Sequence, residues 1–189
     1  MAVSEIPYKT SEGKEGAWEC VGRPTASKEE GRDIEKEYGA SVCIVTATDP
    51  TTGEKLILLE KIFRIPVRNY VIEFPAGLQD PGETDPSLTA IREVKEETGY
   101  VATVDRVMAT HRTSPYNGTG TGKLILMSVD LTTEENQNPQ PELESSEDIE
   151  AFWAPMKGLP DELERRKAEE GVDITALVLS YAVALDFNL

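Results

Sequence analysis

The segment "DPSLTAIREVKEETG" limits the fold of this chain strongly, because both ends of one helix are marked in it. Asp85 is a favourable N-cap residue, and Pro86 suits the first helical turn, where its missing N–H leaves no bond unmade. Gly99 suits the left-handed position that commonly ends a helix. The sequence therefore predicts a helix that begins after Asp85 and ends against Gly99.

This helix carries an acidic face. Glu93, Glu96 and Glu97 are spaced i, i+3 and i+4, so at 3.6 residues per turn their carboxylates project from one side. A solvated surface is the commoner meaning of such a charge run, since a like-charge pair at this spacing costs only about 0.2–0.5 kcal/mol. We expect these glutamates to point away from the packed side of the helix. The apolar residues expected to face the core are Leu88, Ile91 and Val94.

The stretch just upstream, "EFPAGLQDPGE", favours a metal site over a merely solvated surface. It reads as a strand that runs into a glycine turn, which can bring backbone carbonyls beside the carboxylates of the helix. Oxygen donors at this density suit Mg²⁺ or Mn²⁺.

The rest of the chain mixes strands with helices. Apolar and β-branched runs predict strands at "SVCIVTAT", "KLILLEKIF", "NYVIEF", "VDRVMATH", "KLILMSVDL" and "IEAFWAP", the first two joined as a hairpin by "DPTTGE". "DELERRKAEEG" predicts an exposed helix, and the polar residues 132–148 predict a surface loop. "DITALVLSYAVALDF" predicts a closing helix with an apolar stripe of Ile174, Leu177, Val178, Tyr181, Ala182 and Leu185. These elements imply an α/β domain in which helices cover a sheet.

Composition narrows the partners and the location. The 189 residues carry a net charge of -16, which argues against a nucleic-acid partner. An anionic small molecule is not excluded, because a divalent cation can reverse the local potential. Cys20 and Cys43 lack the spacing of a metal or redox motif, so we expect both to be reduced. The polar N-terminus and the absence of a bilayer-length apolar run favour a soluble protein of the cytoplasm, with the nucleus as a second location.

From Gly77 to Tyr100 the chain resembles the Nudix box, which reads glycine, five residues, glutamate, seven residues, then Arg-Glu-apolar-x-Glu-Glu-x-Gly-apolar. The matching positions are Gly77, Glu83, Arg92, Glu93, Val94, Glu96, Glu97, Gly99 and Tyr100. One departure is that eight residues, 84–91, stand where the pattern has seven. Pro86 keeps the distance from Arg92 that is common in the family, so we place the extra residue at Thr84 or Asp85. The helical register should then be intact, while the position of Glu83 stays open.

The likeness narrows to the ADP-ribose pyrophosphatase branch of the family. Pro115 stands sixteen residues after Gly99, which is typical of that branch, and "WECVGR", "FRIPVRNYVIEFPAG" and "SYAVAL" are similar to eukaryotic members. The resemblance implies an α/β/α sandwich with a mixed central sheet and an added N-terminal strand region. Residues 1–40 would form an arm for homodimer formation and substrate contacts, and residues 41–189 the Nudix domain.

The resemblance also implies a reaction, the hydrolysis of ADP-ribose to AMP and ribose 5-phosphate with the help of bound Mg²⁺ or Mn²⁺. Two alternatives stay open. One is hydrolysis of another diphosphate, such as a nucleotide sugar, a dinucleotide or a non-nucleotide compound. The other is a Nudix-fold module that binds a nucleotide without turnover.

Site residues follow from the resemblance position by position. Metal ligands would be Glu93, Glu96, Glu97 and the backbone carbonyl of Ala76. Arg92 would orient these glutamates, Glu83 would assist them, and Glu147 would deprotonate or position the attacking water. Substrate contacts would come from Trp18, Arg23, Arg64, Glu73, Ser114 and Pro115, with Trp18 stacked on adenine and the two arginines on the diphosphate and terminal ribose. For Trp18, the two arginines and Glu147, a purely structural role is the alternative.

Overall fold

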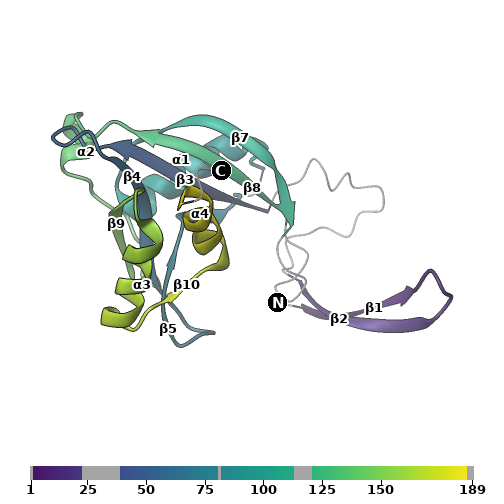
Figure 1. The fold of residues 1–189 in the computed structure, drawn as a ribbon. Coiled ribbons are helices and arrows are strands. Elements are labelled where there is room, and N and C mark those ends of the chain that lie inside the picture. Colours follow the sequence, from purple (N-terminus) through teal and green to yellow (C-terminus); the bar gives the residue numbers. More distant parts are fainter. Residues whose placement is uncertain (1, 23–38, 81, 113–120, 187–189) are drawn as a thin grey trace.

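The computed structural model describes residues 2–22, 39–80, 82–112 and 121–186 (Figure 1). Three of the predicted site residues, Arg23, Ser114 and Pro115, lie outside these ranges. The side chain of Trp18 also lies outside the described part, although its backbone belongs to a strand.

The centre of the molecule is a mixed eight-stranded sheet. Its main path runs in the order β10-β5-β4-β3-β8-β7, with β6 paired to β3 and β9 paired to β4. The β3–β8 and β5–β10 pairs are parallel and the other pairs are antiparallel. The strands are β3 (Ala40–Thr48), β4 (Lys55–Arg64), β5 (Asn69–Glu73), β6 (Ala76–Leu78), β7 (Ala102–Arg112), β8 (Thr121–Val129), β9 (Ile149–Pro155) and β10 (Asp173–Ile174).

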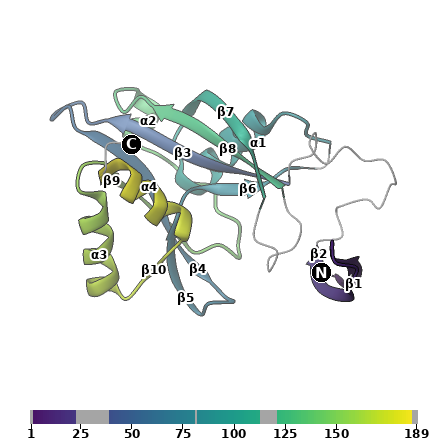
Figure 2. The same cartoon turned by 45° about the vertical axis from the view of Figure 1, so that its right-hand side comes forward.

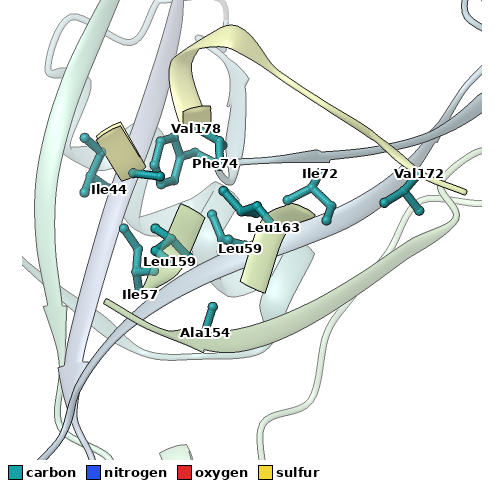
Figure 3. Packing of buried hydrophobic residues seen from close by; sticks show 11 residues of the cluster. Ile44, Ile57, Leu59, Ile72, Phe74, Ala154, Leu159, Leu163, Val172 and Val178 are labelled. Atoms are coloured by element: carbon teal, nitrogen blue, oxygen red, sulfur yellow. The ribbon is translucent and has the colours of Figure 1, made fainter. Parts of the chain in front are cut away.

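Helices cover both faces of this sheet, as the two views show (Figures 1 and 2). They are α1 (Pro86–Thr98), the short α2 (Glu134–Gln137), α3 (Leu159–Glu170) and α4 (Ala176–Asp186). Because strand side chains alternate between faces, Leu58 of β4 packs with α1 while its neighbour Leu59 packs with α3 and α4 (Figure 3). The predicted α/β/α sandwich with a mixed sheet is confirmed.

The N-terminal strands β1 (Ala2–Lys9) and β2 (Glu15–Gly22) pair with each other as a separate antiparallel hairpin. Neither strand pairs with the eight-stranded sheet, and the hairpin lies apart from the main body in both views (Figures 1 and 2). Within the described ranges, no helix is long and apolar enough to cross a membrane.

The predicted ends of α1 are confirmed, but its buried side is not the one we expected. The Asp85 side chain accepts a hydrogen bond from the Ser87 N–H, and Gly99 ends the helix in the left-handed conformation. Leu88 and Ile91 are 55% and 41% exposed, so the prediction that they face the core is wrong. The residues that α1 buries are Thr89, Ala90, Val94, Glu97 and Thr98.

The close approach of α1 to β3 explains why a different side of the helix is buried. The Ser41 hydroxyl of β3 donates a hydrogen bond to the Pro86 carbonyl at 3.0 Å, and the Cys43 thiol lies 3.8 Å from the Ala90 carbonyl. Such short distances to the helix backbone require small side chains at the contact, which Thr89 and Ala90 provide and leucine would not. Leu88 and Ile91 are therefore turned to the outside.

Three smaller corrections concern the C-terminal half. In the predicted closing helix, Ile174 instead belongs to β10, which pairs with β5. Leu177 of α4 is 41% exposed, so it is not part of the core stripe, while Val178 and Ala182 are fully buried. The predicted loop 132–148 contains the short α2, which Thr133 caps by accepting a hydrogen bond from the Asn136 N–H.

Candidate active site

Two glutamates of α1 lie against the backbone of strand β6. The Ala76 N–H donates a hydrogen bond to the Glu97 carboxylate at 3.0 Å. At Gly77 an added Cβ would lie 1.7 Å from the Glu93 carboxyl carbon, so the Glu93 side chain occupies the space that any other residue at position 77 would need. Glycine at this position therefore lets the Glu93 and Glu97 side chains lie against β6, and we call these two residues the inner pair.

Arg92 links the acidic face of α1 to strand β6, which precedes the helix. Its Nη1 donates to Glu93 at 2.7 Å and to Glu96 at 3.2 Å. Its Nη2 donates to the Leu78 carbonyl at 2.9 Å. A planar guanidinium with several fixed donors can hold two carboxylates and a carbonyl in place at once. This arrangement is the one expected of a residue that orients Glu93 and Glu96.

Glu83 lies beside Arg92 in spite of the extra residue that follows it. Its carboxylate accepts hydrogen bonds from the Thr89 hydroxyl at 2.6 Å and from the Asp80 N–H at 3.1 Å, and it is 3.7 Å from Arg92 Nη2. The bond from Thr89 is the main cause that lowers the pKa of Glu83 below its usual value. The extra residue therefore enlarges the loop without removing Glu83 from the site.

We expect deletion of Thr84 to leave the fold intact, and to leave the metal-dependent diphosphate cleavage that the family resemblance implies within about tenfold of the rate of the original chain. Thr84 is exposed, whereas Asp85 caps the helix and Pro86 begins it, so the acidic face keeps its orientation. A substrate assay and a melting curve of the deletion variant check this. A folded variant without activity would show that the helix itself had absorbed the insertion, because one residue turns a helix by about 100°.

The inner pair is more buried than the sequence indicated. Glu97 is only 6% exposed, so the expectation that all three glutamates point away from packing is wrong for this residue. Burial, followed by the nearby charge of Glu93, raises the pKa of Glu97 to about 8. Burial likewise raises the pKa of Glu93. Glu96, with a side chain 43% exposed, lies at the outer edge of the acidic face.

Glu147 comes from the loop between α2 and β9. Its carboxylate accepts a hydrogen bond from the Glu144 N–H at 2.9 Å, which fixes the local turn. Its negative charge is one of the lesser causes that raise the pKa values of both Glu93 and Glu97. The same loop is tied to α1, because the Glu142 N–H donates to the Glu96 carbonyl at 2.7 Å.

Arg64 and Glu73, two predicted substrate residues, form an ion pair. Arg64 Nε donates to the Glu73 carboxylate at 2.6 Å, with side chains 44% and 16% exposed. They stand at the end of β4 and the end of β5, which are adjacent strands. The pair shows that Arg64 is held in place, and it leaves part of the guanidinium open to solvent.

One residue of this region was missed by the sequence reasoning. Glu60 is 1% exposed and lies on β4, and its burial, followed by the charges of Glu97, Glu73 and Glu147, raises its pKa. A signal existed in the sequence, since Glu60 is an acidic residue within the otherwise apolar run "LILLE" of a central strand. An acidic residue in the interior of such a run is unusual and marks either a paired charge or a site.

The oxygen donors of this site are of the kind that bind a divalent cation, although their side chains do not converge on a single position. Among the described residues, no three side chains of His, Cys, Asp or Glu already converge as a ready metal cage. Arg92 accounts for part of this, because it draws Glu93 and Glu96 to itself. A cation would relieve the costly burial of the Glu97 carboxylate next to that of Glu93.

Comparison with known families decides what kind of domain this is. The model of the NUDIX domain matches residues 37–174, well over half of the chain. The chain belongs to the Nudix hydrolase family. The match includes the whole of α1 and the β6 turn, so the acidic centre described above is the Nudix box of this protein.

Several relatives extend over nearly the whole Nudix chain. An uncharacterized Nudix hydrolase of Schizosaccharomyces pombe is 32% identical over all of this chain and 86% of its own length. The ADP-ribose pyrophosphatase of Saccharomyces cerevisiae is 35% identical over 96% of this chain and 75% of its own. The ADP-sugar pyrophosphatase of Mus musculus is 29% identical over 94% and 78%. A crystal structure of an ADP compounds hydrolase shares the fold, with a TM-score of 0.61 at 17% identity over 98% of this chain and 84% of that one.

Proposed function

We propose that this Nudix hydrolase cleaves the diphosphate of ADP-ribose to give AMP and ribose 5-phosphate, with Mg²⁺ or Mn²⁺ as the cation. The observation that carries the proposal is the inner pair, Glu93 and Glu97, packed against the Ala76–Gly77 backbone with the charge of Glu147 nearby. The substrate is supported by relatives named for ADP-ribose and ADP-sugars, which align over most of this chain.

The ligands for the cation would be Glu93, Glu96, Glu97 and the backbone carbonyl of Ala76. A bound divalent cation supplies neutralisation of the diphosphate and a lower pKa for water. The protein supplies position: Arg92 holds Glu93 and Glu96 and is itself held by the Leu78 carbonyl. Glu147 would take the proton of the attacking water, for which its place on a loop beside the inner pair is suitable.

Substrate recognition would use the end of β4 and the N-terminal arm. Arg64 offers guanidinium donors to a phosphate or ribose oxygen, and Glu73 keeps that group oriented. Trp18 would stack on adenine, and Arg23 would share the diphosphate with Arg64. Ser114 and Pro115, which follow β7 in the sequence, would line the same side of the substrate.

A panel of diphosphates tests the proposed reaction. ADP-ribose, other ADP-sugars, UDP-sugars, diadenosine polyphosphates and non-nucleotide diphosphates would each be incubated with Mg²⁺, with Mn²⁺ and with chelator. We expect AMP and ribose 5-phosphate from ADP-ribose in the presence of either cation and none with chelator. Faster cleavage of another compound would make that compound the substrate class. Binding of ADP-ribose without cleavage of any compound would favour the non-catalytic module.

We also propose a homodimer formed through the N-terminal arm, residues 1–40. The hairpin β1–β2 pairs with no other strand of the described chain, and an isolated two-stranded hairpin is marginally stable in water, so a second subunit is a suitable partner for it. Trp18 and Arg23 lie on this arm, which ties dimer formation to substrate binding. The division of the chain near residue 40 stays a prediction.

Removal of residues 1–24 should give a monomer whose kcat/KM for ADP-ribose falls by about tenfold or more, a loss of about 1.4 kcal/mol in transition-state binding. Light scattering and a substrate assay at equal protein concentration measure the two effects. A full-length chain that is monomeric and fully active would contradict the proposal.

A further inference from the structure

Glu60 is a buried carboxylate with no use in the reaction described so far. It is 1% exposed, and neither of its carboxylate oxygens has a hydrogen-bond partner within the described part of the chain. Burying a charged or polar group without a partner opposes folding, and such groups are rare in native proteins. Its strand neighbours Leu58 and Leu59 are fully buried and apolar, so an apolar residue at position 60 would suit the core better.

The direction of the Glu60 side chain follows from strand geometry. Residues two apart on a strand share a face, so Glu60 lies on the same side of β4 as Leu58. Leu58 packs with Ala90 and Val94 of α1, which identifies this side as the one that faces α1. The next turn of α1 after Val94 carries Glu97. Glu60 therefore lies on the side of β4 that faces α1, two residues beyond the apolar contact of Leu58.

Pairing within the sheet gives the same location. Glu60 is directly opposite Glu73 on β5, and opposed residues of an antiparallel pair project to the same face. Glu73 in turn binds Arg64, so Glu60 lies opposite a member of the substrate-side ion pair. Burial raises the pKa of Glu60 well above its usual range, and among nearby charges Glu97 contributes most.

We propose that Glu60 is a positioning residue of the divalent-metal centre, which strengthens cation binding from beneath Glu97 by adding negative charge and by accepting a hydrogen bond from a water that the cation holds. This role gives the two unpartnered oxygens a donor and gives the buried charge a counter-ion. The inference rests on the metal dependence in the proposed function and is independent of ADP-ribose as the substrate.

Mn²⁺ binding to the full-length chain, measured without substrate from the electron paramagnetic resonance signal of free Mn²⁺, tests this role. Glu60→Gln and Glu60→Leu should each weaken Mn²⁺ affinity by about 10- to 100-fold, the range typical of residues that support metal ligands. Glu150→Gln is the matched control, because Glu150 lies on the neighbouring β9, pairs with Lys61 and has a side chain 65% exposed. The Mn²⁺ affinity of the Glu150→Gln variant should stay within about twofold of that of the original chain.

Melting curves in chelator separate this role from a structural one. A positioning residue leaves the metal-free variants as stable as the original chain or more stable, because a buried unpaired charge has been removed. Folded variants with unchanged Mn²⁺ affinity would overturn the proposal, as would an original chain that binds no Mn²⁺. Normal Mn²⁺ binding with the expected loss in both variants, but no cleavage of ADP-ribose, would reject only the proposed substrate.

Discussion

Glu97→Gln should lower kcat for ADP-ribose by about a hundredfold or more while the protein stays folded, because the substitution removes one carboxylate charge of the proposed metal centre. Glutamine keeps the size of the side chain and an oxygen that can accept the bond from the Ala76 N–H. A steady-state assay with Mg²⁺ measures the effect. Glu164→Gln on α3 is the control, since Glu164 is exposed and far along the chain from the Nudix box. Near-normal turnover of the Glu97 variant would remove the basis of the proposed function.

The same variant should be more stable than the original chain when metal is removed, and the gain should depend on pH. The pKa of Glu97 is raised from 4.5 in the unfolded chain to about 8 in the folded one, so its favourable contribution is complete below about pH 4.5 and is lost as pH rises through about 8. In chelator we therefore expect Glu97→Gln to raise Tm more at pH 9 than at pH 5. Equal Tm differences at both values would contradict the buried, protonated state of Glu97.

The ends of α1 could be predicted because their signals are local. Asp85 caps the helix through a neighbour two residues away, and Gly99 adopts a backbone conformation that its own lack of a side chain permits. The acidic face is also a local property, since it depends only on helical spacing. Gly77 is identified by its match to the first glycine of the Nudix box, and the structure adds the physical reason for a glycine there, which is the volume of the Glu93 side chain.

The burial of α1 could not be predicted in the same way, because it depends on which element approaches the helix. The contacts of Ser41 and Cys43 with the α1 backbone decide that Ala90 faces the sheet and Ile91 does not. Nothing within the helix sequence specifies those partners. Glu60 was missed for a related reason: its run of neighbours identifies a buried strand, but only the packing of Leu58 in one core cluster with Ala90 and Val94 indicates that this face of β4 is turned toward α1.

The two glycines of the Nudix box that flank the acidic face differ in what surrounds them. At Gly77 the nearest atoms belong to the flexible end of a glutamate, which can move. At Gly99 an added Cβ would lie 2.5 Å from the backbone nitrogen of Gln140 and 2.7 Å from that of Pro141, and backbone cannot move without shifting its loop. This loop continues to Glu147 and is bound to α1 through the Glu142 N–H. Gly99 is therefore both the helix end and the surface against which the Glu147 loop packs.

Gly99→Ala should destabilise the protein by roughly 2–5 kcal/mol, from about 1–2 for a left-handed alanine and about 1–3 for the overpacked contact. Gly171→Ala is the matched control, because Gly171 ends α3 with φ 70° against 76° at Gly99 but has no atom within 4 Å of the added Cβ. Gly171→Ala should therefore be destabilised only by the left-handed alanine, by about 1–2 kcal/mol. Urea unfolding of the two variants measures the difference.

The turnover of the folded Gly99 variant tests the link to Glu147. Since the loop must shift away from α1, we expect kcat to fall by about tenfold or more at saturating Mg²⁺, whereas the Gly171 variant keeps its activity. The loss should lie in kcat more than in KM, because in the proposed mechanism Glu147 would act on the attacking water. If both alanine variants lose the same stability and the Gly99 variant turns over normally, then the packing of residues 140 and 141 on the end of α1 does not position Glu147.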